Sequence, residues 1–85
     1  MDVIGDRWAV FIMRDAFQGA RRFEEFLDRT GATRATLANR LRALVGQGLL
    51  ERGRYNVSPP RYEYRLTRRG RTLFPVALAA WRWER

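Results

Sequence analysis

The 85-residue chain contains no cysteine, no histidine and no lysine. Disulfide bonds, metal sites built from cysteine or histidine, and catalysis by a histidine base or a cysteine nucleophile are therefore excluded for these residues. An enzyme would have to use carboxylates, tyrosine or arginine. The nine acidic residues are scattered, and the one cluster, Glu24, Glu25 and Asp28, lies at the start of an expected helix, where the dipole favours negative charge. We expect no enzyme, no metal and no cofactor.

Long hydrophobic runs and a signal peptide are also missing. The most apolar stretch, residues 73–81, is far shorter than the roughly 18 residues that a membrane-spanning helix needs. We therefore expect a cytoplasmic protein without a membrane partner. A chain of this length forms one domain, which buries only about 60 to 65% of its unfolded surface and should be modestly stable.

The positive charge is unevenly distributed along the chain. Residues 1–31 contain five arginines and six acids, a net charge of −1, whereas residues 32–85 contain twelve arginines and three acids, a net charge of +9. Coding bias in a GC-rich genome would explain arginine in place of lysine, but it would not explain this asymmetry. A one-sided basic surface is typical of a polyanion partner, because neutralising phosphates releases their condensed counterions.

Two short amphipathic helices around a glycine-containing turn are predicted between residues 23 and 50. Gly31 ends the first helix at a position where a positive φ costs little, and Thr33 is the expected N-cap of the second. The buried stripes at helical spacing are Phe23, Phe26 and Leu27 in the first helix and Leu37, Leu41 and Leu44 in the second. This is the pattern of a helix-turn-helix, whose second helix can enter a DNA major groove.

The other side of the second helix is polar and bears arginine. Thr36, Asn39 and Arg40 are the candidates for base contacts, because asparagine can pair bidentately with adenine and arginine with guanine. The candidates for phosphate contacts are Arg34, Arg42, Arg21 and Arg22. Helix pairs of this kind also occur in purely structural proteins, so it is the charge distribution that favours DNA.

Arg21 and Arg22 precede the first helix of the pair. The backbone N–H groups at this helix N-terminus and the two cationic side chains could together hold a phosphate. The alternative is a loop with two solvated arginines.

A β-hairpin is predicted after Gly48. Tyr62, Tyr64 and Leu66 alternate with charged residues, which indicates a two-faced strand, and residues 50–55 form its antiparallel partner. The tip is expected at residues 56–60, where two prolines lack the N–H for ladder hydrogen bonds. Arginines line this hairpin at positions 52, 54, 61 and 65, with Arg61 the candidate at the tip. Such a wing contacts a minor groove or the flanking phosphates, or is simply solvated.

Scaffold helices are expected at both ends of the chain. In the first, residues 3–18, the expected buried stripe leaves Asp15 outside and consists of Ile4, Trp8, Phe11, Ile12 and Ala16. The last begins after Thr67 as its cap, and its residues 73–81 are apolar nearly all round. Self-association through Leu78, Trp81 and Trp83 would cover the surplus apolar surface. The alternative is that this helix packs on the first one.

The ordered set of motifs resembles the HxlR-type winged helix-turn-helix transcriptional regulators of bacteria. It comprises GDRW at 5–8, RRF at 21–23, Thr33 with Leu37, Arg40, Leu41 and Leu44, GLLER at 48–52, PPRYEYRLTRRG at 59–70, and Pro75 with Trp83. The resemblance implies homodimers, joined largely by their terminal helices, that bind operator DNA and repress or activate nearby genes. Family members often carry a cysteine in a segment before the GDRW helix that some use for sensing; this chain starts at Met1 without one, which excludes thiol sensing by these residues.

The sequence therefore predicts a mostly α fold with a small antiparallel hairpin wing, as one winged helix-turn-helix domain over residues 1–85. The helix-turn-helix occupies about 22–47, the wing about 49–66 and a dimerisation helix about 67–83. The expected partners are double-stranded DNA, with Thr33 added to the contact candidates above, and a second copy of the chain. The alternative is a winged-helix module that binds protein; a small-ligand role is a third possibility, and no effector can be identified.

Overall fold

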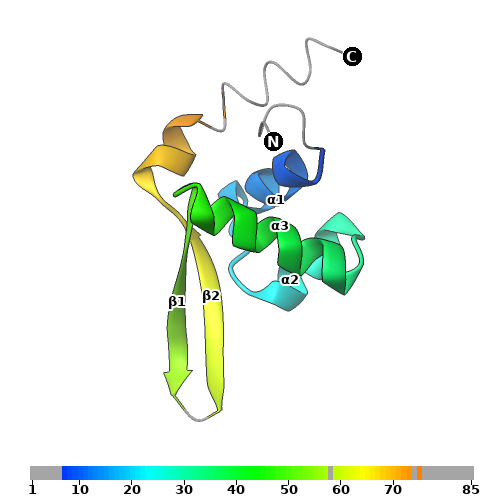
Figure 1. Cartoon of the computed structure of the whole chain (residues 1–85), viewed down its shortest axis with the longest axis vertical. Coiled ribbons are helices and arrows are strands. Elements are labelled where there is room, and N and C mark those ends of the chain that lie inside the picture. The colour runs from blue at the N-terminus through cyan, green and yellow to red at the C-terminus, as the bar shows by residue number, and fades with distance from the viewer. Residues whose placement is uncertain (1–6, 58, 74, 76–85) are drawn as a thin grey trace.

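The computed structural model describes residues 7–57, 59–73 and 75 (Figure 1). Its elements, in chain order, are α1 (Arg7–Phe17), α2 (Phe23–Thr30), α3 (Arg34–Gly46), β1 (Leu50–Val57) and β2 (Pro60–Leu66). Residues 68–73 and 75 are helical. The three helices form one group, from which the hairpin projects (Figure 1). The mostly α fold with an antiparallel hairpin is confirmed; the predictions for Ile4, Leu78, Trp81 and Trp83 lie outside the described residues.

The core lies where the three helices meet the base of the hairpin. Phe26 of α2 is fully buried between the other elements, as are Leu37 and Leu41 of α3. Leu49 and Leu50 continue this core into the start of β1. Because the buried stripe of α3 faces α1 and the hairpin base, the opposite side of α3 is turned away from the core.

Helix α1 is rotated relative to the predicted stripe. Ile12 and Ala16 are buried as predicted, whereas Trp8 and Phe11 are half-buried and pack edge to face at the margin, with ring centroids 5.9 Å apart. Because α1 contacts α2, α3 and β2, its buried face is wider than one stripe. The remaining buried apolar residues of α1 lie outside the prediction: Ala9, Val10 and Met13.

Asp15 was predicted to lie outside the core and is instead buried, at 2% exposure. Its Oδ1 accepts hydrogen bonds from Nε and Nη2 of Arg14, both at 3.2 Å. A carboxylate can be buried when a cation pairs with it, and the neighbouring arginine supplies that cation while keeping partial contact with solvent. A prediction that uses only the spacing of apolar residues cannot identify a buried ion pair.

The turn between α2 and α3 has the predicted chemistry. Gly31 adopts φ 73° at the end of α2, a conformation that favours glycine. Thr33 caps α3, since its Oγ1 accepts a hydrogen bond from the N–H of Thr36 at 3.2 Å. Gly31 therefore ends α2 and Thr33 begins α3, as the sequence predicts.

The wing lies within the predicted range of about 49–66, but its strands reach farther toward the tip than expected. The strands pair antiparallel, with Leu50 opposite Leu66 and Val57 opposite Pro60, and a bulge lies between Arg54 and Asn56. The expected tip began at residue 56, but the ladder continues to Val57 because a proline is tolerated as the first residue of a strand in a two-stranded ribbon.

Thr67 joins the wing to the following helical residues. Its Oγ1 accepts a hydrogen bond from the N–H of Gly70 at 3.0 Å, which confirms the predicted cap, and donates one to the carbonyl oxygen of Gly48 at 2.5 Å. The N–H of Thr67 donates to the carbonyl oxygen of Leu49 at 3.2 Å. Within the described ranges, no helix has the length and apolar character needed to cross a membrane.

Candidate nucleic-acid interface

The polar side of α3 presents the residues predicted to contact bases. Asn39 is exposed, and Thr36 and Arg40 are half-buried. The burial of Leu37 and Leu41 at the core fixes the rotation of α3 about its axis. The structure therefore places the three predicted base-contacting residues on one helix whose orientation is set by packing.

Arg34, the first residue of α3, is paired with Glu24 of α2. Its Nη1 and Nη2 donate to the two carboxylate oxygens at 2.9 and 3.2 Å, and its guanidinium lies over the Phe23 ring, 5.9 Å from the centroid. The hydrogen bond to Glu24 and the charge of that carboxylate raise the pKa of Arg34 above its ordinary value. A residue predicted to hold phosphate thus already holds a carboxylate.

Arg21 and Arg22 have different partners. Nη1 of Arg21 donates to the carbonyl oxygens of Ala16 and Ala20 at 3.0 and 2.9 Å, so this guanidinium binds backbone at the end of α1. The guanidinium of Arg22 lies over the ring of Tyr55 in the wing, 4.4 Å from the centroid. The structure does not gather the two arginines into one phosphate site.

Glu25 occupies the backbone donors beside these arginines. Its Oε1 accepts hydrogen bonds of 2.8 Å from the N–H groups of both Arg21 and Arg22, and these bonds lower the pKa of the carboxylate below its ordinary value. A phosphate at the same two N–H groups would have to displace Glu25. The cluster of Glu24, Glu25 and Asp28 was interpreted as acids that interact favourably with the helix dipole. This interpretation accounts for Glu25, which caps α2, but not for the pairing of Glu24 with Arg34.

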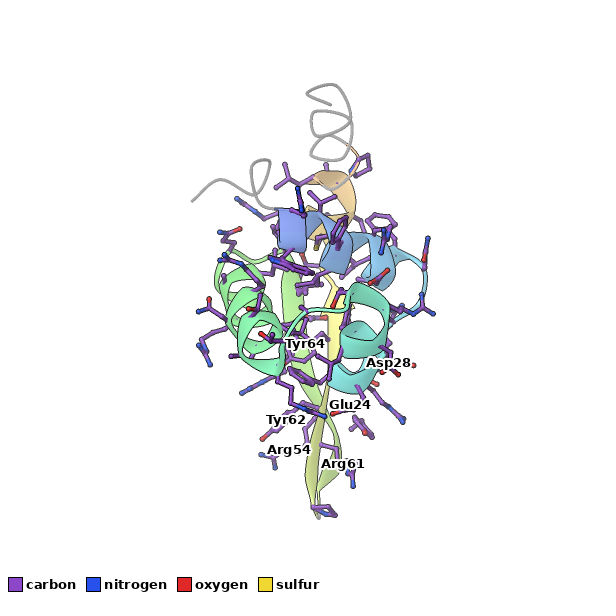
Figure 2. The ribbon with its side chains drawn as sticks, turned by 90° about the vertical axis from the view of Figure 1, so that its right-hand side faces the viewer. Glu24, Asp28, Arg54, Arg61, Tyr62 and Tyr64 are labelled. Carbon is purple, nitrogen blue, oxygen red and sulfur yellow. The ribbon has the colours of Figure 1, made fainter. Side chains whose placement is uncertain are left out.

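One face of the wing combines arginine with tyrosine. The register sets Arg52 opposite Tyr64 and Arg54 opposite Tyr62, and the guanidinium groups of Arg52 and Arg54 lie 4.5 and 5.8 Å from the Tyr62 centroid. We call these four residues the wing face. Figure 2 shows Tyr64 near the base of the hairpin, with Arg54, Arg61 and Tyr62 farther out. The Tyr62 ring therefore lies against both guanidinium groups, while Arg52 and Arg54 remain exposed to solvent.

The positions that alternate with the wing face include two acids, Glu51 of β1 and Glu63 of β2. Glu63, opposite Gly53, accepts a 2.9 Å hydrogen bond from Nε of Arg65, and Arg65 is itself opposite Glu51. Because side chains alternate between the two faces of a strand, these charges lie on the face opposite the wing face. The wing therefore has a cationic side and a side where arginine is balanced by carboxylates.

The wing face adjoins α3. A hollow of about 400 Å³ lies between them, lined by Ala38, Arg42 and Val45 of α3 and by Arg52 and Tyr64 of the wing. Its two arginines are exposed and come from the two elements predicted to bind DNA. A chain of phosphates following this hollow would meet a cation from each side.

Some residues of this surface were not predicted from the sequence. Tyr55 and Tyr62 support arginines, and Glu24 pairs with one; their roles were not anticipated. A hairpin tip centred on residue 58 implies that position 52 pairs with 64 and position 54 with 62, so the sequence did contain a signal for the wing face. Tyr55 and Glu24 contact residues of other elements that are distant in the sequence. Such contacts produce no pattern in the sequence from which they could be predicted.

The sequence matches known regulators along almost its whole length. The profile of the HxlR-like helix-turn-helix family matches residues 3–85. An uncharacterized HTH-type transcriptional regulator of Mycobacterium tuberculosis, Rv3095, is 43% identical over 83 residues, which cover 98% of this chain and 52% of the relative. YybR of Bacillus subtilis, also an uncharacterized HTH-type transcriptional regulator, is 37% identical over 84 residues, which cover 98% of this chain and 67% of YybR. The chain spans about half of the length of the mycobacterial protein.

Solved structures agree with this assignment. A transcription factor of Pseudomonas aeruginosa, PA1374, has a TM-score of 0.86 and 44% identity, covering 94% of this chain and 55% of its own. Diamide-treated YodB of Bacillus subtilis has a TM-score of 0.84 and 28% identity, and the match covers 95% of this chain and 81% of YodB. These relatives are transcription regulators rather than enzymes. The chain described here belongs to the HxlR-like helix-turn-helix family of transcriptional regulators.

Proposed function

We propose that this chain binds duplex DNA in a sequence-specific manner and so regulates transcription in the bacterial cytoplasm. Helix α3 enters the major groove, and the wing face contacts the flanking backbone or the minor groove. The observation that carries this proposal is the hollow between α3 and the wing, which is lined by the exposed Arg42 of α3 and the exposed Arg52 of the wing.

The residues divide into two roles. Asn39 is exposed on α3 and contacts a base, and Thr36 and Arg40 flank it on the same helix. The candidates for holding phosphates, a subset of which engages at one time, are Arg22, Arg34, Arg42, Arg52, Arg54 and Arg61, with Thr33 and Arg21 as neighbouring contacts. Phosphate contacts position the domain, and base contacts give it specificity.

The active form that we propose is a two-fold homodimer. Every residue from 73 to 81 is apolar or proline, and a domain of this size is only modestly stable alone. Leu78, Trp81 and Trp83, which lie outside the described residues, would pack against the partner's terminal helices. The symmetry would turn two α3 helices toward one side of the DNA. Sedimentation at micromolar concentration should show a dimer, and a folded monomer would contradict this part of the proposal.

Selection from a pool of random duplexes tests specific binding. We expect the chain to enrich one sequence that contains an inverted repeat, with half-sites about one helical turn or a small multiple apart. Enrichment of a single half-site would support the α3 assignment and contradict the dimer. If no sequence is enriched over the starting pool, specific DNA binding is contradicted.

A further inference from the structure

The pair formed by Glu24 and Arg34 lies at the N-terminus of α3, where a helix-turn-helix protein approaches DNA. Both terminal nitrogens of the guanidinium are engaged, at 2.9 and 3.2 Å, and the two side chains are 66% and 67% exposed. Exposed ion pairs contribute little to stability, so this one opens at small cost. The end of α2 at Gly31 and the start of α3 at the Thr33 cap are formed by other hydrogen bonds, which do not involve this pair.

A carboxylate and a phosphate use a guanidinium in the same way. Each presents two oxygens to the forked N–H groups, so Glu24 occupies on Arg34 the edge that a DNA phosphate would occupy. When Arg34 turns to a phosphate, it uncovers the negative charge of Glu24 close to the polyanion. The attraction gained by one group is then reduced by the repulsion of the other.

We infer that Glu24 competes with DNA phosphate for Arg34 and thereby limits the affinity of the domain for DNA of any sequence. This inference rests on the proposed function. It distinguishes Glu24 from its neighbour Glu25, which accepts backbone hydrogen bonds and caps α2. A regulator that must leave non-specific DNA quickly benefits from such a limit, because phosphate contacts carry no sequence information.

Asp28 provides a matched control. It lies on α2 four residues after Glu24, is exposed, and has no ion pair with a described residue. Figure 2 shows Glu24 nearer to the hairpin and Asp28 farther along α2. Glu24→Gln and Asp28→Asn remove the same charge from the same helix, and only the first releases Arg34.

The experiment measures binding of the purified full chain to a selected and to a scrambled duplex over a range of salt concentrations. We expect Glu24→Gln to tighten binding to both duplexes by about 3- to 10-fold and to steepen the salt slope by about 0.9 per subunit, as one added phosphate contact does. Asp28→Asn should give a clearly smaller gain. In an Arg34→Gln background, Glu24→Gln should lose most of its effect, because the two residues then no longer interact.

Three results would overturn the inference while leaving DNA binding intact. The first is weaker binding of Glu24→Gln to the selected duplex alone, which would make Glu24 a residue that positions Arg34 for a base. The second is an equal gain from Asp28→Asn, and the third is a full gain in the Arg34→Gln background. If the unmodified chain shows no salt-dependent DNA binding, the proposed function fails and the inference fails with it.

Discussion

The guanidinium of Arg22, at the start of α2, lies over the ring of Tyr55 in the wing, 4.4 Å from its centroid. Nearer the core, Phe26 and Tyr64 pack edge to face with centroids 6.3 Å apart. These two contacts join α2 to the hairpin at two levels. The position of the wing relative to α2 therefore depends on a stacked arginine toward the outer end of the wing and on the pair of buried Phe26 and half-buried Tyr64 at its base.

Tyr55→Leu removes the ring beneath Arg22. An exposed cation–π contact contributes about 0.5 to 1 kcal/mol, so we expect about 2- to 5-fold weaker binding to all duplexes alike, with discrimination between sequences unchanged. Fluorescence anisotropy with a selected and a scrambled duplex measures both. Tyr55→Phe keeps the ring and should bind like the unmodified chain; equal losses in the two variants would show that the hydroxyl, and not the stacked ring, matters.

Asn39→Ala and Arg61→Ala separate base contacts from phosphate contacts. Asn39 is exposed on α3, so its loss should cost about 1 to 3 kcal/mol on the selected duplex and reduce discrimination at one position. Arg61 lies on the outer part of the hairpin, and its loss should weaken all sequences by a similar factor and flatten the salt dependence (Figure 2). Identical behaviour of the two variants in the same binding assay would show that this division of roles is wrong.

Gly70→Ala should destabilise the fold. A Cβ at this buried position would overlap the carbonyl oxygen of Leu49 and lie 3.3 Å from Cε of Met13, so backbone must move at the base of the wing. Overpacking of this kind costs about 1 to 3 kcal/mol or more. Gly46→Ala is the control, since its Cβ would meet nothing within 4 Å and alanine favours the helix by about 0.5 to 1 kcal/mol. Urea unfolding should show a lower free energy of unfolding for Gly70→Ala and a higher one for Gly46→Ala than for the unmodified chain.

Glu25 should make stability depend on acidity. The hydrogen bonds from Arg21 and Arg22 lower its pKa in the folded state below the ordinary value of 4.5, so its contribution is present above that value and is lost as the pH falls through the folded pKa. Urea unfolding between pH 6 and about pH 3 measures this loss. The glutamine in Glu25→Gln can still accept the hydrogen bonds but does not titrate. The free energy of unfolding of this variant should therefore fall less over that pH range than that of the unmodified chain. Parallel curves for the two proteins would contradict the role of Glu25.

Much of the fold could be predicted because its signals are local. Gly31 and Thr33 determine the turn and the cap of α3 through their own backbone and side chain, and the alternation around Tyr62 and Tyr64 indicates a strand. The rotation of α1 could not be predicted, because the half-burial of Trp8 and the full burial of Asp15 arise only when three other elements pack around the helix.

The candidate site divides in the same way. The side of α3 that bears Asn39 follows from helical periodicity, whereas the partner of Arg34 depends on where α2 places Glu24, ten residues earlier in the chain. A charge pattern indicates how many arginines are present but not which of them already bind carboxylates or carbonyl oxygens. Arg21 illustrates this: its guanidinium is bonded to the backbone at the end of α1.

The affinity of the unmodified chain for its selected duplex, measured from low to moderate salt, tests the central claim most directly. Cations from both α3 and the wing should engage phosphates, so the logarithm of the affinity should fall linearly with the logarithm of salt concentration, with a slope that corresponds to roughly 5 to 10 phosphate contacts for a dimer. The scrambled duplex should bind more weakly at every salt concentration. Binding that is insensitive to salt, or equal for the two duplexes, would contradict sequence-specific recognition by α3 and the wing face.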